Sequence, residues 1–310
     1  MAGVTDAPFR QLAWRFGAGH LVGEMVSAKA DLWHTSKSRL RRQSFVGISP
    51  VAVQIAGGDP ATIADAARRH WQDGAEIVDI NFGCPAKKVC RKAAGSALLA
   101  DEDLVARIIA AAVAAVPIPI TVKIRSGYSP ELRNGLTIAT IAESEGAAAV
   151  TVHGRTRACR FRGAAEHDTV AAIKDRVSIP VIANGDISDA AQVNEVMAAT
   201  GVDAVMIGRA ALGAPWLLGQ IAGVTGELSV AEKLDTMMEH LLSGQQFYGD
   251  AGVRIMRKHM MWYFEKLDGF RTAEDRRVLV RTFNTLTEAE AQQQFLQQLA
   301  RDVPAIDAAA

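Results

Sequence analysis

The feature of this sequence that most constrains its fold is a regular alternation of short apolar runs with longer helical patterns. Each run is almost continuously apolar, which is typical of parallel strands buried on both faces. The runs predicted as strands are residues 21–26, 51–55, 77–81, 120–123, 150–153, 181–184 and 205–207. Helical patterns between them include residues 62–73, 101–116, 135–146 and 189–199. This alternation predicts the α/β class with a parallel sheet, and Ser188 is the expected N-cap of the helix over 189–199.

Seven strands are one fewer than an eight-stranded (β/α)8 barrel, the TIM barrel, requires. The chain opens on Met1-Ala2-Gly3-Val4-Thr5-Asp6, which is typical of a loop that follows a strand, and a helix is expected over 8–16. The sequence therefore predicts a TIM barrel whose first strand is missing from this chain.

After Gly226 the strand–helix alternation stops, and residues 230–248, 252–267 and 273–300 are all predicted to be helical. Leu234, Met237, Met238, Leu241 and Leu242 keep helical spacing, which favours the core of a small bundle. The expected domains are a catalytic barrel over 1–226 and a helical domain over 227–310, with a frayed tail at 307–310.

Composition narrows the class of protein further. The chain has 310 residues, of which 49% are hydrophobic and 22% charged, and its formal net charge is zero. Overall charge therefore does not favour a nucleic-acid partner, so such a partner has to be argued from local clusters. Three cysteines without a CxxC pair indicate a reducing compartment. With no apolar run of membrane-spanning length and no metal-ligand spacing, we expect a cytoplasmic monomer without membrane contact or metal.

Polar side chains stand at the exit of six successive predicted strands. They are Gln54, Asn81, Lys123, His153, Asn184 and Arg209. In a TIM barrel the active site lies at the carboxyl ends of the strands. A single such residue is explained by an ordinary loop hydrogen bond, but the whole set predicts a functional site at one mouth of the barrel.

The last two strand exits indicate a phosphate site. Asn184-Gly185-Asp186 and Gly208-Arg209 follow neighbouring strands, and barrels commonly bind phosphate at this position. Glycines let backbone N–H groups approach oxygen atoms, and Arg209 is suited to a bidentate contact with phosphate. The pattern alone does not distinguish FMN from a sugar phosphate.

Lys123 and His153 have two interpretations each. A lysine facing the electron-rich edge of a flavin stabilises the reduced, anionic form, whereas the same lysine in a barrel aldolase forms a Schiff base. His153 either orders its loop or contacts a ligand.

The segment from Asn81 to Ser96 carries the most telling chemistry. Cys84 comes just after a strand exit and before Pro85, which stiffens the loop. A thiol at this place is suited to act as a nucleophile or general acid because its pKa is tunable. Cys90 and Cys159 fit the more common role of small, inert, buried residues.

Basic residues gather in two segments close to these strand exits, with no acidic residue among them. They are Lys87, Lys88, Arg91 and Lys92 beside Cys84, and Arg155, Arg157, Arg160 and Arg162 after His153. Runs of charge usually form a solvated face, but two clusters at one mouth of a neutral protein favour a bound polyanion.

Five segments together resemble the tRNA-dihydrouridine synthases, and they follow the family's order over nearly the whole chain. They are Met1–Asp6, the Gly83-Cys84-Pro85 segment, His153-Gly154-Arg155-Thr156-Arg157, Asn184-Gly185-Asp186 and Gly208-Arg209. Lys88-Val89-Cys90 and the run from Ala94 to Leu99 are similar to the bacterial B-type subgroup.

The resemblance implies an FMN-binding TIM barrel and a C-terminal helical domain that helps to hold tRNA. NADPH reduces FMN, a hydride passes to C6 of a flipped-out D-loop uridine, and Cys84 protonates C5. The residues implied to bind FMN are Met1, Ala2, Gln54, Lys123, His153, Asn184, Gly185, Asp186, Gly208 and Arg209. Those expected near the RNA are Asn81, Lys87, Lys88, Arg91, Arg155 and Arg157.

The sequence departs from the family pattern in lacking the first strand and in carrying Phe82 where methionine is common. Three alternatives remain open at this stage. One is a small-molecule FMN-dependent barrel oxidoreductase similar to dihydroorotate dehydrogenase. The others are a non-catalytic tRNA-binding or nitrogen-regulation protein that keeps FMN as structure, and a metal or Schiff-base aldolase.

Overall fold

The structure is a computed structural model that describes residues 1–43, 47–90, 94–267 and 272–307, without the side chains of residues 88, 273 and 303–307. The chain forms two compact units. The first contains residues 1–5 and 20–210, and the second contains residues 6–19 and 211–310.

The first unit is built on one parallel sheet in which each strand pairs with the next along the chain, in the order β1 to β7. The strands are β1 (Val26–Ser27), β2 (Ala52–Ala56), β3 (Ile77–Asn81), β4 (Ile120–Arg125), β5 (Ala149–His153), β6 (Val181–Asn184) and β7 (Ala204–Met206). All seven predicted strands are present. The first was predicted too long, because within residues 21–25 only an isolated bridge from Val22 to Ala52 joins the sheet.

The register of the sheet groups the polar strand residues on one face. Gln54 pairs with Asp79, Asn81 with Lys123, and Arg125 with His153. Side chains alternate between the two faces of a strand. The apolar residues between these polar ones, such as Ile80 and Val122, are fully buried. The alternation with helices therefore yields the predicted TIM-like α/β architecture.

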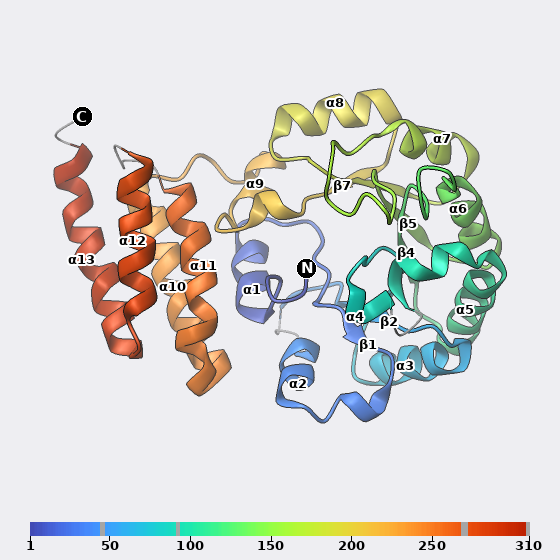
Figure 1. Cartoon of the computed structure of the whole chain (residues 1–310), viewed down its shortest axis with the longest axis horizontal. Helices are drawn as coiled ribbons and strands as arrows, with labels where there is room; N and C mark the ends of the chain where they lie inside the picture. Colours follow the sequence, from blue (N-terminus) through green and yellow to red (C-terminus); the bar gives the residue numbers. More distant parts are fainter. Residues whose placement is uncertain (44–46, 91–93, 268–271, 308–310) are drawn as a thin grey trace. The chain divides into compact units, whose positions relative to one another are not determined.

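Helices surround this sheet, and Figure 1 shows α3 and α5 to α8 along its outside. Their bounds are α2 (Ser36–Arg42), α3 (Pro60–Gln72), α4 (Lys87–Cys90), α5 (Glu102–Ala115), α6 (Gly135–Ser144), α7 (Asp168–Arg176) and α8 (Ala190–Thr200), with short 3-10 turns η1 (Ala30–Leu32), η2 (Gly95–Ala100) and η3 (Arg209–Ala211). Aspartates begin several of them, since a carboxylate accepts the free N–H groups of a first turn. The expected N-cap Ser188 is wrong. Asp189 accepts from Gln192 N instead, while Ser188 donates to the Gln192 side chain.

The second unit consists of helices, which Figure 1 shows as coiled ribbons. They are α1 (Ala7–Arg15), α9 (Leu217–Ile221), α10 (Val230–Tyr248), α11 (Gly252–Lys266), α12 (Ala273–Thr285) and α13 (Ala289–Asp307), with the 3-10 turn η4 (Gly249–Ala251). Their shared core includes Leu234, Met237 and Leu241 of the predicted stripe, and Met238 packs against it partly buried. Leu242, which was predicted to be core as well, is 44% exposed. A capping box of Ser229 and Glu232 begins α10.

Two features of this unit differ from the sequence-based picture. The single helix expected over 273–300 is two helices, because Leu286 turns to an extended backbone and its carbonyl accepts from Arg257. No proline or glycine marks this break. Helix α1 joins the C-terminal helices, and residues 211–226 do so as well, whereas the expected boundary lay at residue 226.

The expected tail at 307–310 lies outside the described residues apart from Asp307. No helix in the described part of the chain is both long and apolar enough to span a bilayer.

Candidate functional site

A chain of hydrogen-bonded side chains links the exits of β2 and β3. The side chain of Asn81 donates to Gln54 Oε1 at 2.9 Å, and Gln54 Nε2 donates to Asp79 Oδ2 at 2.7 Å. Thr121 Oγ1 donates to the other oxygen of Asp79 at 2.7 Å. Asp79 was not singled out from the sequence. The available signal was its place two residues before Asn81, which puts both side chains on the same face of β3.

Lys123 lies on this same face and is half-buried. Its Nζ donates to Asn184 Oδ1 at 2.8 Å, and Asn184 Nδ2 donates to the carbonyl of Met206 at 2.8 Å. Burial lowers the pKa of Lys123 to about 8, although the nearby carboxyl of Asp79 acts in the opposite direction. Burial likewise raises the pKa of Asp79 to about 6. The lysine is thus a desolvated cation that a neighbouring anionic ligand would stabilise.

The loops after β6 and β7 meet at Asp186, a non-glycine residue with φ of 51°. Its carboxylate accepts from both terminal nitrogens of Arg155, from Arg209 Nη2 at 2.8 Å and from Ala165 N at 2.9 Å. The Arg155 side chain is only 3% exposed, whereas that of Arg209 is 55% exposed. Arg155 therefore ties two loops together, and Arg209 is the member of this cluster that solvent or a ligand can reach.

Two glycines lie beside this cluster, and a side chain would have a different effect at each. A Cβ added at Gly208 would have only Asn184 Nδ2 within 4 Å, at 3.9 Å, so the backbone there is approachable. Gly185 has φ of 125°, which side chains rarely adopt, and an added Cβ would lie 2.7 Å from the Cβ of Ala165. Close approach of a ligand to the backbone at Gly208 fits the predicted phosphate site.

His153 is a neutral imidazole in this setting. Burial, then the charges of Lys123, Arg125 and Arg155, lower its pKa to about 3. Its Nε2 lies 3.3 Å from Arg155 Nη1 and is oriented to accept. His153 therefore orders the arginine and can accept a hydrogen bond without adding positive charge.

The turn that carries Cys84 is held from three directions. Asn81 Oδ1 accepts from the backbone N–H groups of Gly83 at 3.0 Å and Cys84 at 2.8 Å. The carbonyl of Cys84 accepts from Ser96 Oγ at 2.9 Å and from Ser96 N at 3.1 Å. Asn81, expected near the RNA base, thus supports the turn, and Cys84 itself is half-buried.

Arg125 completes this support and was missed in the sequence. It is 1% exposed at the end of β4. Its Nε donates to the Gly83 carbonyl at 2.7 Å, and its Nη1 donates to the carbonyls of Thr156 at 3.0 Å and Arg160 at 2.8 Å. Burial lowers the pKa of Arg125 to about 10, partly offset by the cysteine side chains, of which Cys84 has the largest effect. The period-two pattern Thr121, Lys123, Arg125 was the signal that could have revealed it.

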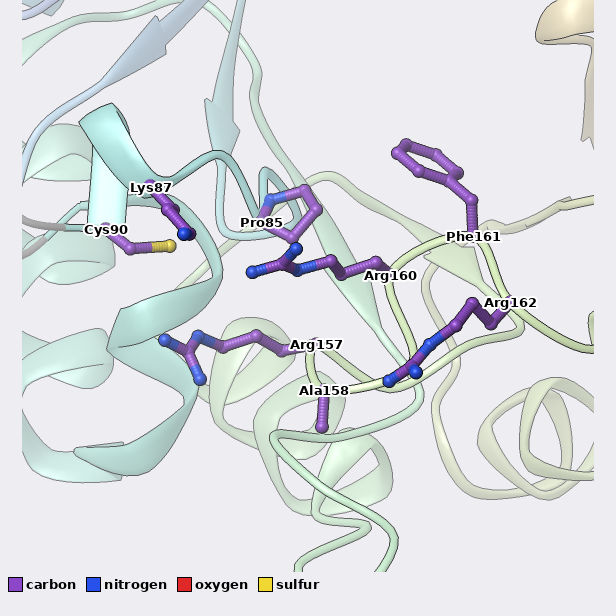
Figure 2. Close-up of a pocket in the computed structure, with 8 residues that line it drawn as sticks. All are labelled: Pro85, Lys87, Cys90, Arg157, Ala158, Arg160, Phe161 and Arg162. Atoms are coloured by element: carbon purple, nitrogen blue, oxygen red, sulfur yellow. The ribbon is translucent and has the colours of Figure 1, made fainter.

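A cavity of about 820 Å³ lies beside the Cys84 turn (Figure 2). It is lined by Pro85, Lys87, Cys90, Arg157, Ala158, Arg160, Phe161 and Arg162. Four of these residues are cationic and none is acidic. Figure 2 shows the side chains of Arg157 and Arg160 extending from the loop after β5 toward Lys87 and Cys90 on α4. The geometry is that of an anion-binding cavity.

The loop that supplies these arginines is shaped by specific contacts. Arg160 has φ of 56°, a backbone conformation uncommon for a non-glycine residue, and its carbonyl is held by Arg125. The guanidinium of Arg157 stacks on the ring of Tyr128, with its central carbon 4.6 Å from the ring centroid. Phe161 is 55% exposed at the rim. An exposed aromatic ring among cations is the combination that single-stranded nucleic acids recognise.

The remaining predicted residues lie elsewhere or are not described. Met1 and Ala2 form the N-terminal turn of the first unit, where Met1 is 40% exposed and the following Gly3 donates to the buried Glu24. The side chain of Lys88 and all of Arg91 lie outside the described residues. Within the described part of the chain, no three histidine, cysteine or acidic side chains are grouped to hold a metal ion.

Comparison with known proteins gives a consistent result. The family model for dihydrouridine synthase (Dus) matches residues 1–304. The tRNA-dihydrouridine synthase B of Pseudomonas aeruginosa is 52% identical over 299 residues, covering 94% of this chain and 88% of that protein. The protein of the same name from Escherichia coli K12 is 48% identical over 307 residues, covering 96% and 93%.

Proposed function

Since the chain belongs to the dihydrouridine synthase family, and within it to the B type, we propose that it is a flavin-dependent tRNA-dihydrouridine synthase. It reduces the C5–C6 double bond of a uridine in the D-loop of tRNA, with FMN as cofactor and NADPH as electron donor. It acts in the cytoplasm as a monomer.

The observation that carries this proposal is the position of Cys84. Its turn is held by Asn81, Ser96 and Arg125, and the cavity beside it is lined by four cations and no acidic residue. A positioned thiol next to an anion-binding cavity suits protonation of a base whose flanking phosphates are bound. A small-molecule oxidoreductase, the main alternative from the sequence, has no need for these cations.

The residues at the strand ends fit FMN. Lys123 is a half-buried ammonium that would lie against the electron-rich part of the flavin, and Gln54 and Asn184 offer amide groups beside it. The open space at Gly208 and the half-exposed Arg209 suit the phosphate. The chemistry that bound FMN supplies is hydride transfer to C6 of the uracil ring, with electrons from NADPH.

The residues of the chain have separate roles in this reaction. Cys84 donates the proton that C5 requires, and Arg125 positions its turn through the Gly83 carbonyl. Lys87, Arg157 and Arg160 bind backbone phosphates beside the extruded uridine, which must leave its stack for the site to reach it. Arg254 on α11 is exposed and belongs to the helical unit that we propose helps to hold tRNA.

The test uses the full chain loaded with FMN, NADPH and an unmodified tRNA transcript. Dihydrouridine is measured by mass spectrometry, and flavin reoxidation is followed by absorbance. We expect Cys84→Ala to slow dihydrouridine formation by roughly 10²- to 10⁴-fold, the usual contribution of a general acid. Cys159→Ala is the matched control and should retain activity within about twofold of the parent.

Two results would contradict the proposal. One is flavin reoxidation that tRNA does not accelerate, which would favour a small-molecule substrate. The other is a Cys84→Ala variant as active as the Cys159→Ala control.

A further inference from the structure

Cys90 is a second thiol next to the Cys84 turn, and the proposed reaction does not use it. It ends α4, is half-buried, and lines the cationic cavity. Its Sγ lies 3.6 Å from the carbonyl oxygen of Cys84 and 3.9 Å from Ser96 Oγ. The sequence predicts an inert, buried thiol at this position, but Cys90 is half-buried and lines the cavity.

The two cysteines are within reach of each other. A carbonyl oxygen lies about 2.4 Å from the Cα of its own residue, so Cys90 Sγ is at most about 6 Å from the Cα of Cys84. Across a disulfide a sulfur lies roughly 3.5–4.5 Å from the Cα of the partner cysteine, so Cys90 Sγ has to approach the Cys84 side chain by at most about 2.5 Å. Closing the disulfide therefore requires new side-chain rotamers and a shift of α4, which is only four residues long.

The surroundings of the two cysteines are electropositive. Lys87, Arg157 and Arg160 line the same cavity as Cys90, and Arg125 is held against the residue before Cys84. Reactive cysteines occupy electropositive, partly exposed sites of this kind. A half-buried thiol in such a cavity is open to small oxidants.

We propose that Cys90 is a resolving cysteine that forms a reversible disulfide with Cys84 when the protein meets hydrogen peroxide. One thiolate attacks a peroxide oxygen: an S–O bond forms, the O–O bond breaks, and hydroxide leaves and is protonated to water. The other thiol then attacks the resulting sulfenic sulfur, forming the S–S bond and releasing a second water. The two sulfurs lose two electrons and the peroxide gains them.

This disulfide removes the thiol that protonates the base, a consequence that rests on the proposed function. It also protects Cys84, because a disulfide is reducible whereas sulfinic and sulfonic acids are not readily restored. The enzyme would therefore be switched off reversibly under oxidising conditions.

The third cysteine is a natural control. Cys159 accepts a hydrogen bond from Thr156 Oγ1 at 3.1 Å and lies in the loop after β5. Like the other two it is a half-buried free thiol. Its hydrogen-bond partner Thr156 lies in the same loop, whereas Cys90 contacts the Cys84 turn.

The experiment treats the FMN-loaded full chain, and its Cys90→Ser and Cys159→Ser variants, with hydrogen peroxide, with and without later dithiothreitol. Peptide mapping locates disulfides, and dihydrouridine formation is compared with each variant's own untreated sample. We expect a Cys84–Cys90 disulfide, with a mass loss of about 2 Da, in the parent and in Cys159→Ser. Their activity should fall by about a hundredfold and return with dithiothreitol.

Cys90→Ser should form no disulfide at Cys84, and its loss of activity should persist after dithiothreitol because Cys84 is oxidised further. A Cys84–Cys159 disulfide, or no disulfide at Cys84 in the parent, would overturn the proposal. Untreated enzyme that makes no dihydrouridine would instead contradict the proposed function, and peptide mapping would still decide whether the disulfide forms.

Discussion

Arg125 donates a hydrogen bond of 2.7 Å from Nε to the carbonyl oxygen of Gly83, the residue before Cys84. The same guanidinium holds the carbonyls of Thr156 and Arg160 on the loop after β5. One buried side chain therefore joins the turn with the thiol to the loop that supplies three cations of the cavity.

We expect Arg125→Lys to lower kcat by about tenfold or more, with a smaller effect on KM for tRNA, because an ammonium cannot reproduce the planar fork that reaches both loops. Carbonyls left without partners should also destabilise the protein by about 1–3 kcal/mol. Steady-state kinetics and urea denaturation measure both effects. Arg133→Lys, at a half-exposed ion pair with Glu166, should change neither by much. Equal effects of the two substitutions would contradict the role of Arg125.

Gly154→Ala should destabilise the protein strongly. A Cβ at this position would lie 2.0 Å from the carbonyl oxygen of Glu166, a backbone atom of the residue whose N–H donates to the Gly154 carbonyl. Relief requires the loop after β5 to move, at a cost of roughly 2 kcal/mol or more. Gly226→Ala, where nothing lies within 4 Å of an added Cβ, is the matched control. Thermal denaturation of the two variants should separate them clearly, and similar melting temperatures would refute the packing argument.

Neutralising the cavity should reduce the salt dependence of tRNA binding. Each of Arg157→Gln and Arg160→Gln removes one cation from the cavity, and the slope of log Kd against log salt should fall by about one unit per contact with phosphate. Arg68→Gln, on an exposed face of α3 beside Asp65, should leave the slope unchanged. Binding titrations at several salt concentrations test this. An unchanged slope in both cavity variants would place the RNA elsewhere.

The affinity for FMN should weaken as pH rises. Burial lowers the pKa of Lys123 to about 8, so the free protein loses this cation above that pH and has to take up a proton to bind an anionic group there. The dissociation constant should rise by about tenfold between pH 7 and pH 9. Lys123→Met should bind FMN more weakly at pH 7 and show little pH dependence, whereas Lys174→Met, at an exposed pair with Asp203, should behave as the parent. Fluorescence titration measures each constant, and a parent without pH dependence would argue against Lys123 as a charged ligand contact.

The helical unit should lose stability in mild acid through His240. This residue is fully buried, its Nδ1 lies 3.0 Å from Tyr263 OH, and its Nε2 has no hydrogen-bond partner among the described residues. Burial lowers the pKa of His240 to about 3. Between pH 3 and about 6.5 the unfolded chain binds more protons at this residue than the folded one. Its stabilising contribution is therefore complete above pH 6.5 and is lost as pH falls.

Urea denaturation at pH 7.5 and pH 5.5 tests this relation. The free energy of unfolding of the parent should fall between pH 7.5 and pH 5.5. In His240→Gln this fall should be smaller by about 1 kcal/mol. His34→Gln, at an exposed position, should retain the pH dependence of the parent. A His240→Gln variant with the full acid sensitivity would assign the effect to other groups.

The barrel-like alternation, the positions of most strands and the polar residues at the strand exits can all be predicted from the amino-acid sequence. These features depend on local periodicity, since a buried parallel strand needs a continuous apolar run and its exit needs a polar turn. The Cys84-Pro85 turn and the glycines after β6 and β7 were visible for the same reason.

Which side chains contact each other is not predictable from the sequence and depends on the tertiary fold. Arg125 and Gly83 are 42 residues apart, and Arg155 and Asp186 are 31 apart. Helix α1 joins helices more than two hundred residues away, as Tyr248 donates to Asp6. These partners depend on the paths of intervening loops and on the burial of charge, and neither is encoded in the spacing of residues along one element. Local patterns therefore place the thiol and the cations near one edge of the sheet, and long-range contacts orient them around one cavity.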